Sequence, residues 1–296
     1  MGSNSDKTIL VTGITGQQGG AVARRLHADG WRVRGLTRDP NAERARPARE
    51  LGIELVTGDL TDEPSLAAPL AGVYGVFAMA TPFEKGMENE VAQGNTLGNV
   101  AAAADVKHYV YSSVGSANKK TGIPHFDSKA VVEEHLKHLD LPLTIIRPVY
   151  FMENLVKWGA RTDEGLIVPV PLSATTRLQM IAVDDVAAIV ALTFAQPEKY
   201  IGKAFDIAGD ELTFPEAAFA VSTGIGEPVR YVQTPWEAVR AQNEDIYLMY
   251  DWFERKGYGV DIADVRKMHP ELLDFKAWVA RGGAAPLTAL RATPEG

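Results

Sequence analysis

The chain has 296 residues, 23% of them charged, and a net charge of −8, and it is long enough to bury a sizeable core. Because it has no cysteine, disulfides, thiolate metal ligands and cysteine nucleophiles are excluded. The acidic charge argues against a general nucleic-acid binder, which normally carries a basic face. No apolar run approaches the roughly 20 residues of a membrane span, and the start MGSNSDK has no apolar signal-peptide core. We therefore expect a cytoplasmic protein with no metal site and no nucleic-acid or membrane partner.

The stretch from Thr8 to Pro40 predicts a strand, a glycine turn, a helix and a second strand. The short apolar run Ile9–Val11 suits a strand buried on both faces of a parallel sheet. A helix is expected from Gly20 to Ala28, with a closing Gly30, and a second strand from Trp31 to Leu36. This order of elements is typical of the first unit of a dinucleotide-binding domain.

Three glycines form the predicted turn. Gly13, Gly16 and Gly19 follow the spacing G-x-x-G-x-x-G, one residue longer than the commonest dinucleotide fingerprint. Glycine is expected where a backbone passes close to a pyrophosphate or needs a positive φ. The following helix directs its free N–H groups and positive dipole end at the phosphates. The alternative interpretation is an ordinary strand-to-helix turn.

The end of the second strand indicates which dinucleotide binds. It reads Thr37, Arg38, Asp39. An arginine there binds a 2′-phosphate through a charge-assisted contact, whereas an acidic residue would bind the ribose hydroxyls of NAD. We expect Arg38 to select NADP(H), and Asp39 to cap a helix with Pro40 at its first position.

Strands and helices alternate beyond this unit. The pattern predicts a doubly wound parallel Rossmann sheet, in which ligands lie at the carboxyl ends of the strands. At those ends, Asp59 could contact adenine or belong to a turn, and Thr81 and Phe83 could border the nicotinamide. The further strands are expected at Ile53–Thr57, Val73–Ala80, Tyr109–Ser113 and Leu143–Arg147.

A helix with a lysine near its start is predicted between the fifth and sixth strands. Its apolar stripe places Lys129 on the first turn, where the helix dipole disfavours a positive charge. Lys129 is therefore either a residue that binds the ribose hydroxyls of the cofactor or a solvated surface lysine. The stripe consists of Val131, Val132, His135, Leu136 and Leu139.

The C-terminal part is expected to form a smaller, partly helical domain. A helix is predicted at Thr213–Ile225, a strand at Pro228–Gln233, and one or two helices at Trp236–Tyr258. The aromatic cluster Tyr247–Phe253 favours a core over a cleft. Asp184 and Asp185 are interpreted as helix caps. We place an NADP-binding domain at residues 1–155, to which about 178–208 return, and a substrate or effector domain at 156–296.

The motifs VTGITGQQGG, TRDP, YSSVGS, PHFDSK and IIRPVYFMENL together resemble the NmrA-like group of atypical short-chain dehydrogenases/reductases. The resemblance continues through FDIAGDELTFPEAA and DIADVRKMHPELLDFKAW, and so covers almost the whole chain. It implies an NADP-preferring Rossmann domain and a smaller domain, with a substrate or effector cleft.

The resemblance also implies roles for individual residues. The phosphates would be held by the glycine turn, the 2′-phosphate by Arg38, and the nicotinamide ribose by Lys129. The residues implied to contact the phosphates are Gly13, Thr15, Gly16, Gln17, Gln18 and Gly19. Those implied to contact adenine are Asp59 and Leu60, and those implied to contact the nicotinamide half are Ala80 and Thr81. Those implied to line the cleft beside the cofactor are Tyr150, Phe151 and Asn154.

One departure from the family's enzymes concerns catalysis. Active short-chain dehydrogenases carry Tyr-x-x-x-Lys, whose tyrosine passes a proton to the carbonyl oxygen. Here the position four before Lys129 is His125. Ordinary tyrosine-based carbonyl reduction is therefore not expected, and His125 becomes the candidate proton donor.

Two functions follow. The first is an NADPH-dependent reductase of a flat, apolar quinone, dye, enone or carbonyl compound, held against Phe83, Tyr150 and Phe151, with Lys129 and His125 at the reaction centre. The second is a non-catalytic redox sensor that binds NADP(H) and reports its state to a protein partner, which requires different affinities in its two conformations. A homodimer is compatible with either.

Overall fold

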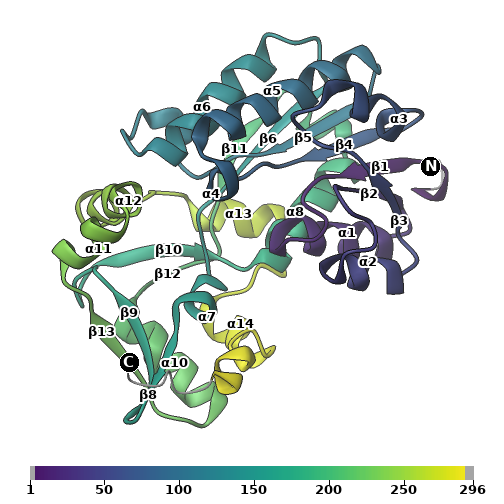
Figure 1. Cartoon of the computed structure of the whole chain (residues 1–296). Helices are drawn as coiled ribbons and strands as arrows, with labels where there is room; N and C mark the ends of the chain where they lie inside the picture. Colours follow the sequence, from purple (N-terminus) through teal and green to yellow (C-terminus); the bar gives the residue numbers. More distant parts are fainter. Residues whose placement is uncertain (1–3, 291–296) are drawn as a thin grey trace. The chain divides into compact units, whose positions relative to one another are not determined.

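The computed structural model describes residues 4–290, and its longest sheet is parallel, as the alternation of strands and helices predicts (Figure 1). Within those residues this sheet has seven strands in the order β11-β6-β5-β4-β1-β2-β3. β1 pairs with both β2 and β4, so the strand order reverses between β1 and β4. The bounds are β1 Thr8–Val11, β2 Arg32–Thr37, β3 Glu54–Thr57, β4 Gly75–Ala78, β5 His108–Ser112, β6 Leu143–Pro148 and β11 Ala204–Ile207.

Helices cover both faces of this sheet, which makes it a doubly wound Rossmann fold. Figure 1 shows α5 and α6 on one face, and α1 and α2 on the other. The helices are α1 Gln17–Ala28, α2 Arg46–Glu50, α3 Ala67–Leu70, α4 Pro82–Lys85, α5 Met87–Ala103, α6 Pro124–Lys137, α8 Val183–Ala195 and α9 Pro197–Tyr200. Short 3₁₀ turns lie at Asn4–Asp6, Glu43–Ala45, Glu63–Leu66 and Ala117–Lys119.

Two glycines bring α5 and α6 close together. A Cβ on Gly94 would lie 2.6 Å from Val132, and one on Gly98 would lie 2.4 Å from Leu136. Val132 and Leu136 are fully buried, as the predicted stripe requires. Val131 is 52% exposed, so its place in the stripe is wrong. Glu133 of α6 is buried instead, and because it is charged, a pattern of apolar residues alone does not place it on the buried face of the helix.

Residues beyond the sheet form two smaller sheets and further helices. Within the described chain, one sheet has the order β12-β10-β7 and the other β13-β9-β8. The strands are β7 Tyr150–Phe151, β8 Ala160–Thr162, β9 Gly165–Val170, β10 Arg177–Ile181, β12 Asp210–Thr213 and β13 Val229–Gln233. The helices are α7 Asn154–Trp158, α10 Phe214–Ile225, α11 Trp236–Gln242, α12 Glu244–Arg255, α13 Ile262–Met268 and α14 Phe275–Ala280, with a 3₁₀ turn at Ala285–Ala289.

Local signals explain the boundaries of this C-terminal region. Thr213 caps α10 in a capping box with Glu216, at the predicted helix start. Tyr250, Trp252 and Phe253 are buried, so the aromatic cluster of α12 is core. The capping role predicted for Asp185 is wrong, because its carboxylate accepts hydrogen bonds from the ring of His269 and the backbone N–H of Leu273.

The contacts divide the chain into two units. Among the described residues, one contains 4–120, 124–147 and 186–206, and the other contains 121–123, 148–185 and 207–290. The first unit holds the seven-stranded sheet. That one unit binds cofactor and the other binds substrate or effector stays a prediction.

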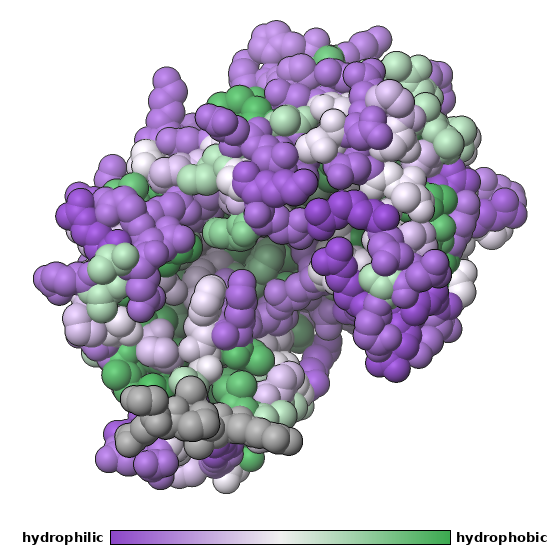
Figure 2. All heavy atoms as spheres, viewed as in Figure 1, coloured by the Kyte–Doolittle hydropathy of each residue, from purple (hydrophilic) through white to green (hydrophobic). Residues whose placement is uncertain are grey.

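Hydrophilic residues cover most of the face shown in Figure 2, and hydrophobic ones gather in small groups. No helix among residues 4–290 is both long and apolar enough to cross a membrane.

A buried histidine on β5 makes stability depend on pH. His108 is fully buried, with Nε2 2.8 Å from the Thr144 hydroxyl, which itself donates to the Tyr200 carbonyl. Burial lowers the pKa of His108 to about 4. Because the unfolded chain binds this proton more readily, the stabilising contribution is complete above about pH 6.5 and is lost as the pH falls toward 4.

We expect the free energy of unfolding to fall by up to about 3 kcal/mol over this range. Urea unfolding at pH 7 and pH 4.5 measures the loss. His108→Gln, which has no titrating group at this buried position, should lose less stability over the same interval. Equal losses in both proteins would show that His108 does not cause the effect.

Candidate functional site

The turn between β1 and α1 has the backbone geometry that close approach of a phosphate requires. Gly13 has φ +64°, and its carbonyl accepts the Gly16 N–H at 2.8 Å. A Cβ on Gly19 would lie 2.3 Å from the Gly13 carbonyl oxygen and 2.4 Å from that of Thr12. Glycine is therefore required at Gly13 by conformation and at Gly19 by space.

The turn leaves part of its backbone accessible. Gly16 and Gln17 are exposed and Thr15 is half-buried, at the N-terminal end of the 12-residue helix α1. Gln18 is buried, and its side-chain amide donates to the Ser112 hydroxyl at 2.7 Å. This bond ties α1 to the end of β5, so any contact of Gln18 with phosphate falls to its backbone N–H.

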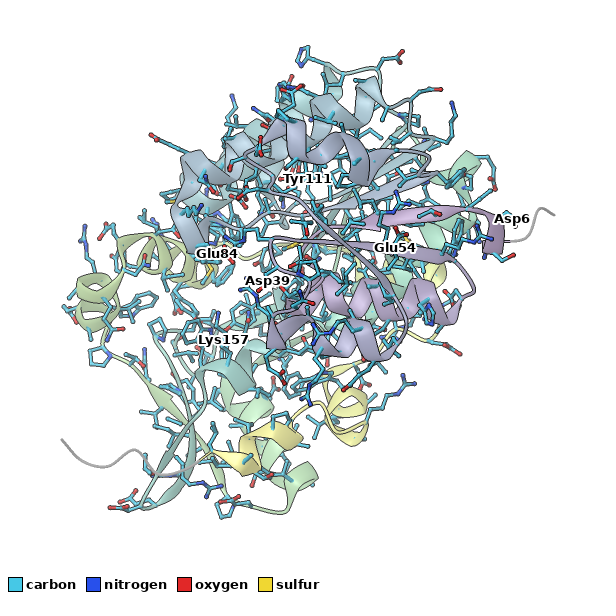
Figure 3. The ribbon with its side chains drawn as sticks, turned by 45° about the vertical axis from the view of Figure 1, so that its right-hand side comes forward. Asp6, Asp39, Glu54, Glu84, Tyr111 and Lys157 are labelled. Carbon is cyan, nitrogen blue, oxygen red and sulfur yellow. The ribbon has the colours of Figure 1, made fainter. Side chains whose placement is uncertain are left out.

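Arg38 follows β2, where the sequence predicts the cofactor's 2′-phosphate. Its guanidinium donates to Glu84 of α4 at 2.9 Å, and both side chains are about half exposed (Glu84 is labelled in Figure 3). An exposed pair of this kind contributes about 0–1 kcal/mol, so an incoming phosphate can replace the carboxylate.

The helix cap predicted at Asp39 is wrong. Its carboxylate accepts the backbone N–H of Asn41 at 2.8 Å, and the first helical turn after it is Glu43–Ala45. The side chain closes a local turn in place of capping a helix from Pro40.

Asp59 and Leu60 lie after β3, at the predicted adenine site. The Asp59 carboxylate accepts the backbone N–H and hydroxyl of Thr61, at 2.8 and 2.7 Å. These hydrogen bonds, with Lys85 and Arg38 nearby, lower the pKa of Asp59. The structure thus uses Asp59 in the turn, and Leu60 packs half-buried against the sheet's core.

The carboxyl end of β4 lies beside the glycine turn. The Thr12 hydroxyl donates to the Met79 carbonyl and accepts the Met79 N–H, both at 2.8 Å. Ala80 follows and is buried, and Thr81 caps α4 by accepting the Phe83 N–H. Phe83 is 64% exposed. The Thr12 side chain therefore ties the start of the predicted phosphate turn to the end of β4, where the predicted nicotinamide residues lie.

Lys129 reaches the same edge from α6. Its ammonium donates to the Ala80 carbonyl at 3.1 Å and to the carboxylate of Glu90. Lys129 lies on the second turn of α6 and not on the first, because the helix begins at Pro124. The surface-lysine alternative is wrong, since only 13% of the side chain is exposed.

His125 occupies the turn of α6 before Lys129. It is 6% exposed, and its ring lies 4.8 Å from the Phe126 ring and 5.7 Å from the Phe83 ring. The spacing of four residues places it on the same face of the helix as Lys129. His125, Lys129 and Phe83 therefore form one group.

The remaining cleft candidates belong to the second unit. Tyr150 is buried with its hydroxyl 3.3 Å from that of Tyr250, and burial raises its pKa well above the usual range. Phe151 and Asn154 are half-buried, at the end of β7 and the start of α7. Tyr150 therefore lies within a packed aromatic group, whereas the side chains of Phe151 and Asn154 are partly accessible to solvent.

Three residues that carry or contact a buried or half-buried carboxylate were not predicted from the sequence. Glu90 is fully buried, Ser128 donates to it at 2.6 Å, and Glu153 accepts the Val183 N–H and the Trp278 indole. Burial raises the pKa of Glu153. Ser128 and Glu153 lie within the motifs PHFDSK and IIRPVYFMENL but have no assigned role there, whereas Glu90 lies in none of the motifs. The helical spacing of Glu90 relative to Gly94 and Gly98 could have indicated its face.

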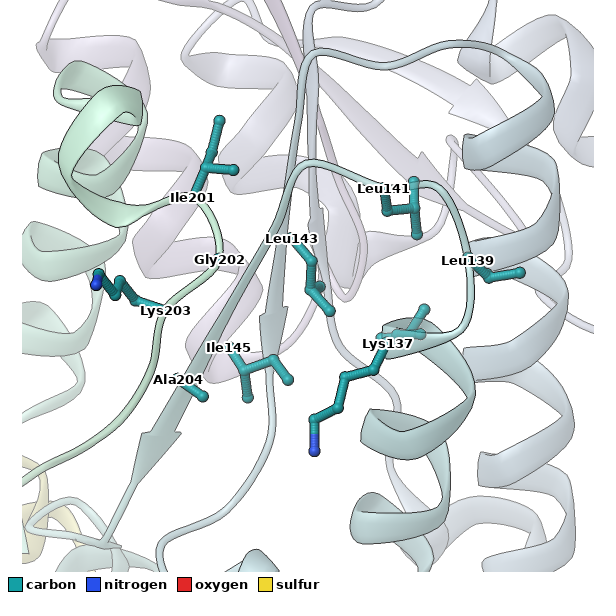
Figure 4. A pocket seen from close by; sticks show the side chains of 10 residues that line it. Lys137, Leu139, Leu141, Leu143, Ile145, Ile201, Gly202, Lys203 and Ala204 are labelled. Carbon is teal, nitrogen blue, oxygen red and sulfur yellow. The ribbon is translucent and has the colours of Figure 1, made fainter.

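A separate groove beside the edge strand β11 has a different character (Figure 4). It holds about 320 Å³, and its polar side chains are Lys137 and Lys203, whose amines point to different sides in Figure 4. No polar groups converge on it, so it lacks the features of a cofactor site. Its apolar lining is Leu136, Leu139, Leu141, Leu143, Ile145 and Ile201.

Comparison with known proteins agrees with this geometry. The family model described as the NmrA-like family matches residues 5–278. The chain is 30% identical over 281 residues to the NmrA-like family domain-containing oxidoreductase notA of Aspergillus sp., covering 80% of this chain and 79% of that protein. It is 29% identical over 233 residues to an NAD(P)H azoreductase of Xenophilus azovorans, covering 78% and 79%.

Among solved structures, NmrA, a negative transcriptional regulator, in complex with NADP superposes with a TM-score of 0.81 at 21% identity, over 96% of this chain and 98% of that one. This likeness concerns the fold.

Proposed function

The chain belongs to the NmrA-like family, and we propose that it is an NADPH-dependent reductase of a flat, apolar quinone, dye, enone or carbonyl compound. One observation carries the proposal: the glycine turn, the end of β4 and the Lys129 ammonium are joined by hydrogen bonds at one edge of the sheet. An azoreductase among the relatives supports an extended, apolar acceptor.

The residues fit a nicotinamide dinucleotide. The turn from Gly13 to Gly19 would hold the pyrophosphate, since Gly16 and Gln17 are exposed where α1 begins and the glycines let the turn close tightly. Arg38 would hold the 2′-phosphate. Lys129 has three ammonium protons, of which two meet Ala80 and Glu90, and the third would meet the nicotinamide ribose. The bound cofactor supplies a hydride.

The protein's own groups would then handle the acceptor. Phe83, largely exposed beside His125, offers an apolar face for a flat substrate. Quinones, dyes and enones need little acid assistance, and His125 is the proton donor in this proposal. The Lys129 ammonium would stabilise negative charge that develops on the acceptor.

A second candidate is a non-catalytic sensor of NADP(H) with a protein partner. The observation that favours it is His125, 6% exposed, in place of the expected tyrosine. The similar fold of NmrA, a negative transcriptional regulator, agrees with this alternative. Such a sensor works only if its two conformations bind NADPH and NADP⁺ with different affinities.

Turnover separates the two candidates. NADPH oxidation is followed at 340 nm with quinones, triarylmethane dyes, azo dyes, enones and aldehydes. The reductase proposal predicts turnover with at least one class and a changed pH profile in His125→Phe. Tight NADPH binding without oxidation by any class would favour the sensor, and an unchanged profile would remove His125 from the mechanism.

Cofactor preference tests Arg38. Removing a charge-assisted contact costs about 1.5–3 kcal/mol, so Arg38→Ala should bind NADPH roughly 10- to 100-fold more weakly and NADH nearly as before. Calorimetric titration of both cofactors measures this. Arg44→Ala, a change of an exposed arginine beyond the β2 end, is the control. Equal NADPH and NADH affinities in the parent protein would contradict the assignment.

A further inference from the structure

Glu90 is a fully buried carboxylate on the first turn of α5. Oε2 accepts the Ser128 hydroxyl at 2.6 Å, and Oε1 accepts the Lys129 ammonium. Both partners lie on α6. An ionised carboxylate is costly to bury unless it is paired and hydrogen-bonded, and here both oxygens have charged or polar donors. Glu88, on the same helical turn, is exposed.

The pair fixes the direction of the lysine. The Lys129 ammonium is held by Glu90 from α5 and by the Ala80 carbonyl after β4. Two of its three protons are thereby directed, so the third has a defined direction too. A lysine held by one partner alone could rotate its ammonium, because its stem is long and flexible.

The surrounding packing keeps Glu90 and Lys129 within reach. Gly94, one turn along α5 from Glu90, lets Val132 of α6 approach closely. On α6 the neighbouring Glu133 forms a buried bidentate pair with Arg147, at 2.7 and 2.6 Å. These contacts fix α6 against both α5 and β6, so the position of Lys129 is set by the sheet and by α5 together.

We propose that Glu90 is a positioning residue that aims the third proton of the Lys129 ammonium at the nicotinamide ribose, with Ser128 orienting the carboxylate. The inference rests on the proposed function, because it takes Lys129 as a cofactor contact. Glu90 itself touches neither cofactor nor substrate. Its effect must therefore appear in the nicotinamide half of the cofactor and not in the adenosine half.

Comparing the affinities of two ligands separates the contributions of the nicotinamide half and the adenosine half of the cofactor. NADPH reaches both Arg38 and Lys129, whereas 2′,5′-ADP carries the 2′-phosphate but no nicotinamide ribose. The ratio of the two calorimetric affinities reports what the nicotinamide half contributes. We expect Glu90→Gln to lower the advantage of NADPH over 2′,5′-ADP about tenfold, the range for one hydrogen bond to a charged group.

Three variants complete the experiment. Lys129→Met should lower the same ratio by a similar factor, and Glu90→Gln/Lys129→Met should lower it no further than either single change. Glu88→Gln, on the same helical turn, should leave it unchanged. A general loss of structure would weaken both ligands and leave the ratio as in the parent, which would overturn the positioning role.

The outcomes distinguish the two proposals. A ratio lowered in Lys129→Met but not in Glu90→Gln leaves the cofactor site intact and overturns the role of Glu90. A ratio unchanged in both shows that Lys129 does not contact the nicotinamide half, which removes the cofactor assignment as well. If Glu90→Gln does not fold, Ser128→Ala takes its place, with an expected loss of about threefold in the ratio and none in 2′,5′-ADP binding.

Discussion

Replacing Gly19 by alanine is expected to weaken NADPH binding about 100-fold, and to weaken NADH, which carries the same pyrophosphate, equally. The new Cβ would lie 2.3 Å from the Gly13 carbonyl oxygen and 2.4 Å from that of Thr12. Both are backbone atoms, so a side-chain rotation cannot relieve the clash. Overpacking costs about 1–3 kcal/mol, and the displaced atoms belong to the turn proposed to hold the pyrophosphate.

The neighbouring glycine provides the control. A Cβ on Gly20 would lie 3.3 Å from the Ile14 carbonyl oxygen, a tight contact that a small shift relieves. Gly20→Ala should therefore bind NADPH within about threefold of the parent, since alanine is also the better helix former. Fluorescence titration with NADPH measures both variants. Unchanged affinity in Gly19→Ala would place the phosphates elsewhere.

The parallel sheet and the glycine turn were predictable because their signals are local. Short apolar runs end at Gly58, Thr81 or Ser113, and their alternation with helices leaves few topologies. The structure confirms the doubly wound sheet and places the turn after β1. The carboxyl ends of parallel strands lie at one edge of the sheet, so residues as distant as Gly13 and Ala80 could be assigned to that edge.

Side-chain partners were not predictable in the same way. Asp39 and Asp185 both precede or begin segments that resemble helix starts, yet one binds the Asn41 N–H and the other binds Leu273, 88 residues away. For Asp185 a tertiary contact decides between the alternatives, whereas at Asp39 a local turn competes with capping. Helix propensity describes where an aspartate can cap, but it does not say which distant donor competes for it.

Glu90 illustrates the limit most clearly. In the segment MENEV, Glu88 and Glu90 look equivalent, and both suit the first turn of a helix. Their burial differs only because Gly94 and Gly98 draw α6 onto one face of α5. Lys129 could be named from its place before an apolar stripe, whereas its counter-ion comes from a helix 39 residues earlier in the chain.

Loss of the Lys129 charge should have the second large effect. Lys129→Met leaves the Glu90 carboxylate, which is 0% exposed, with Ser128 as its remaining donor. Breaking a buried ion pair costs about 3–5 kcal/mol, because an uncompensated charge stays buried. We expect the free energy of unfolding in urea at pH 7 to fall by about that amount, and NADPH-dependent turnover to fall roughly 10- to 100-fold.

Stability and turnover should respond differently when the counter-ion is neutralised as well. Glu90→Gln/Lys129→Met removes both charges, so most of the lost stability should return. Turnover should not return, because the ammonium proposed to contact the nicotinamide ribose and the acceptor is still missing. Lys137→Met, which changes an exposed lysine of the same helix, should alter neither quantity appreciably. Recovery of turnover along with stability would mean that Lys129 acts through the fold alone, and chemistry at this edge of the sheet would then need another residue.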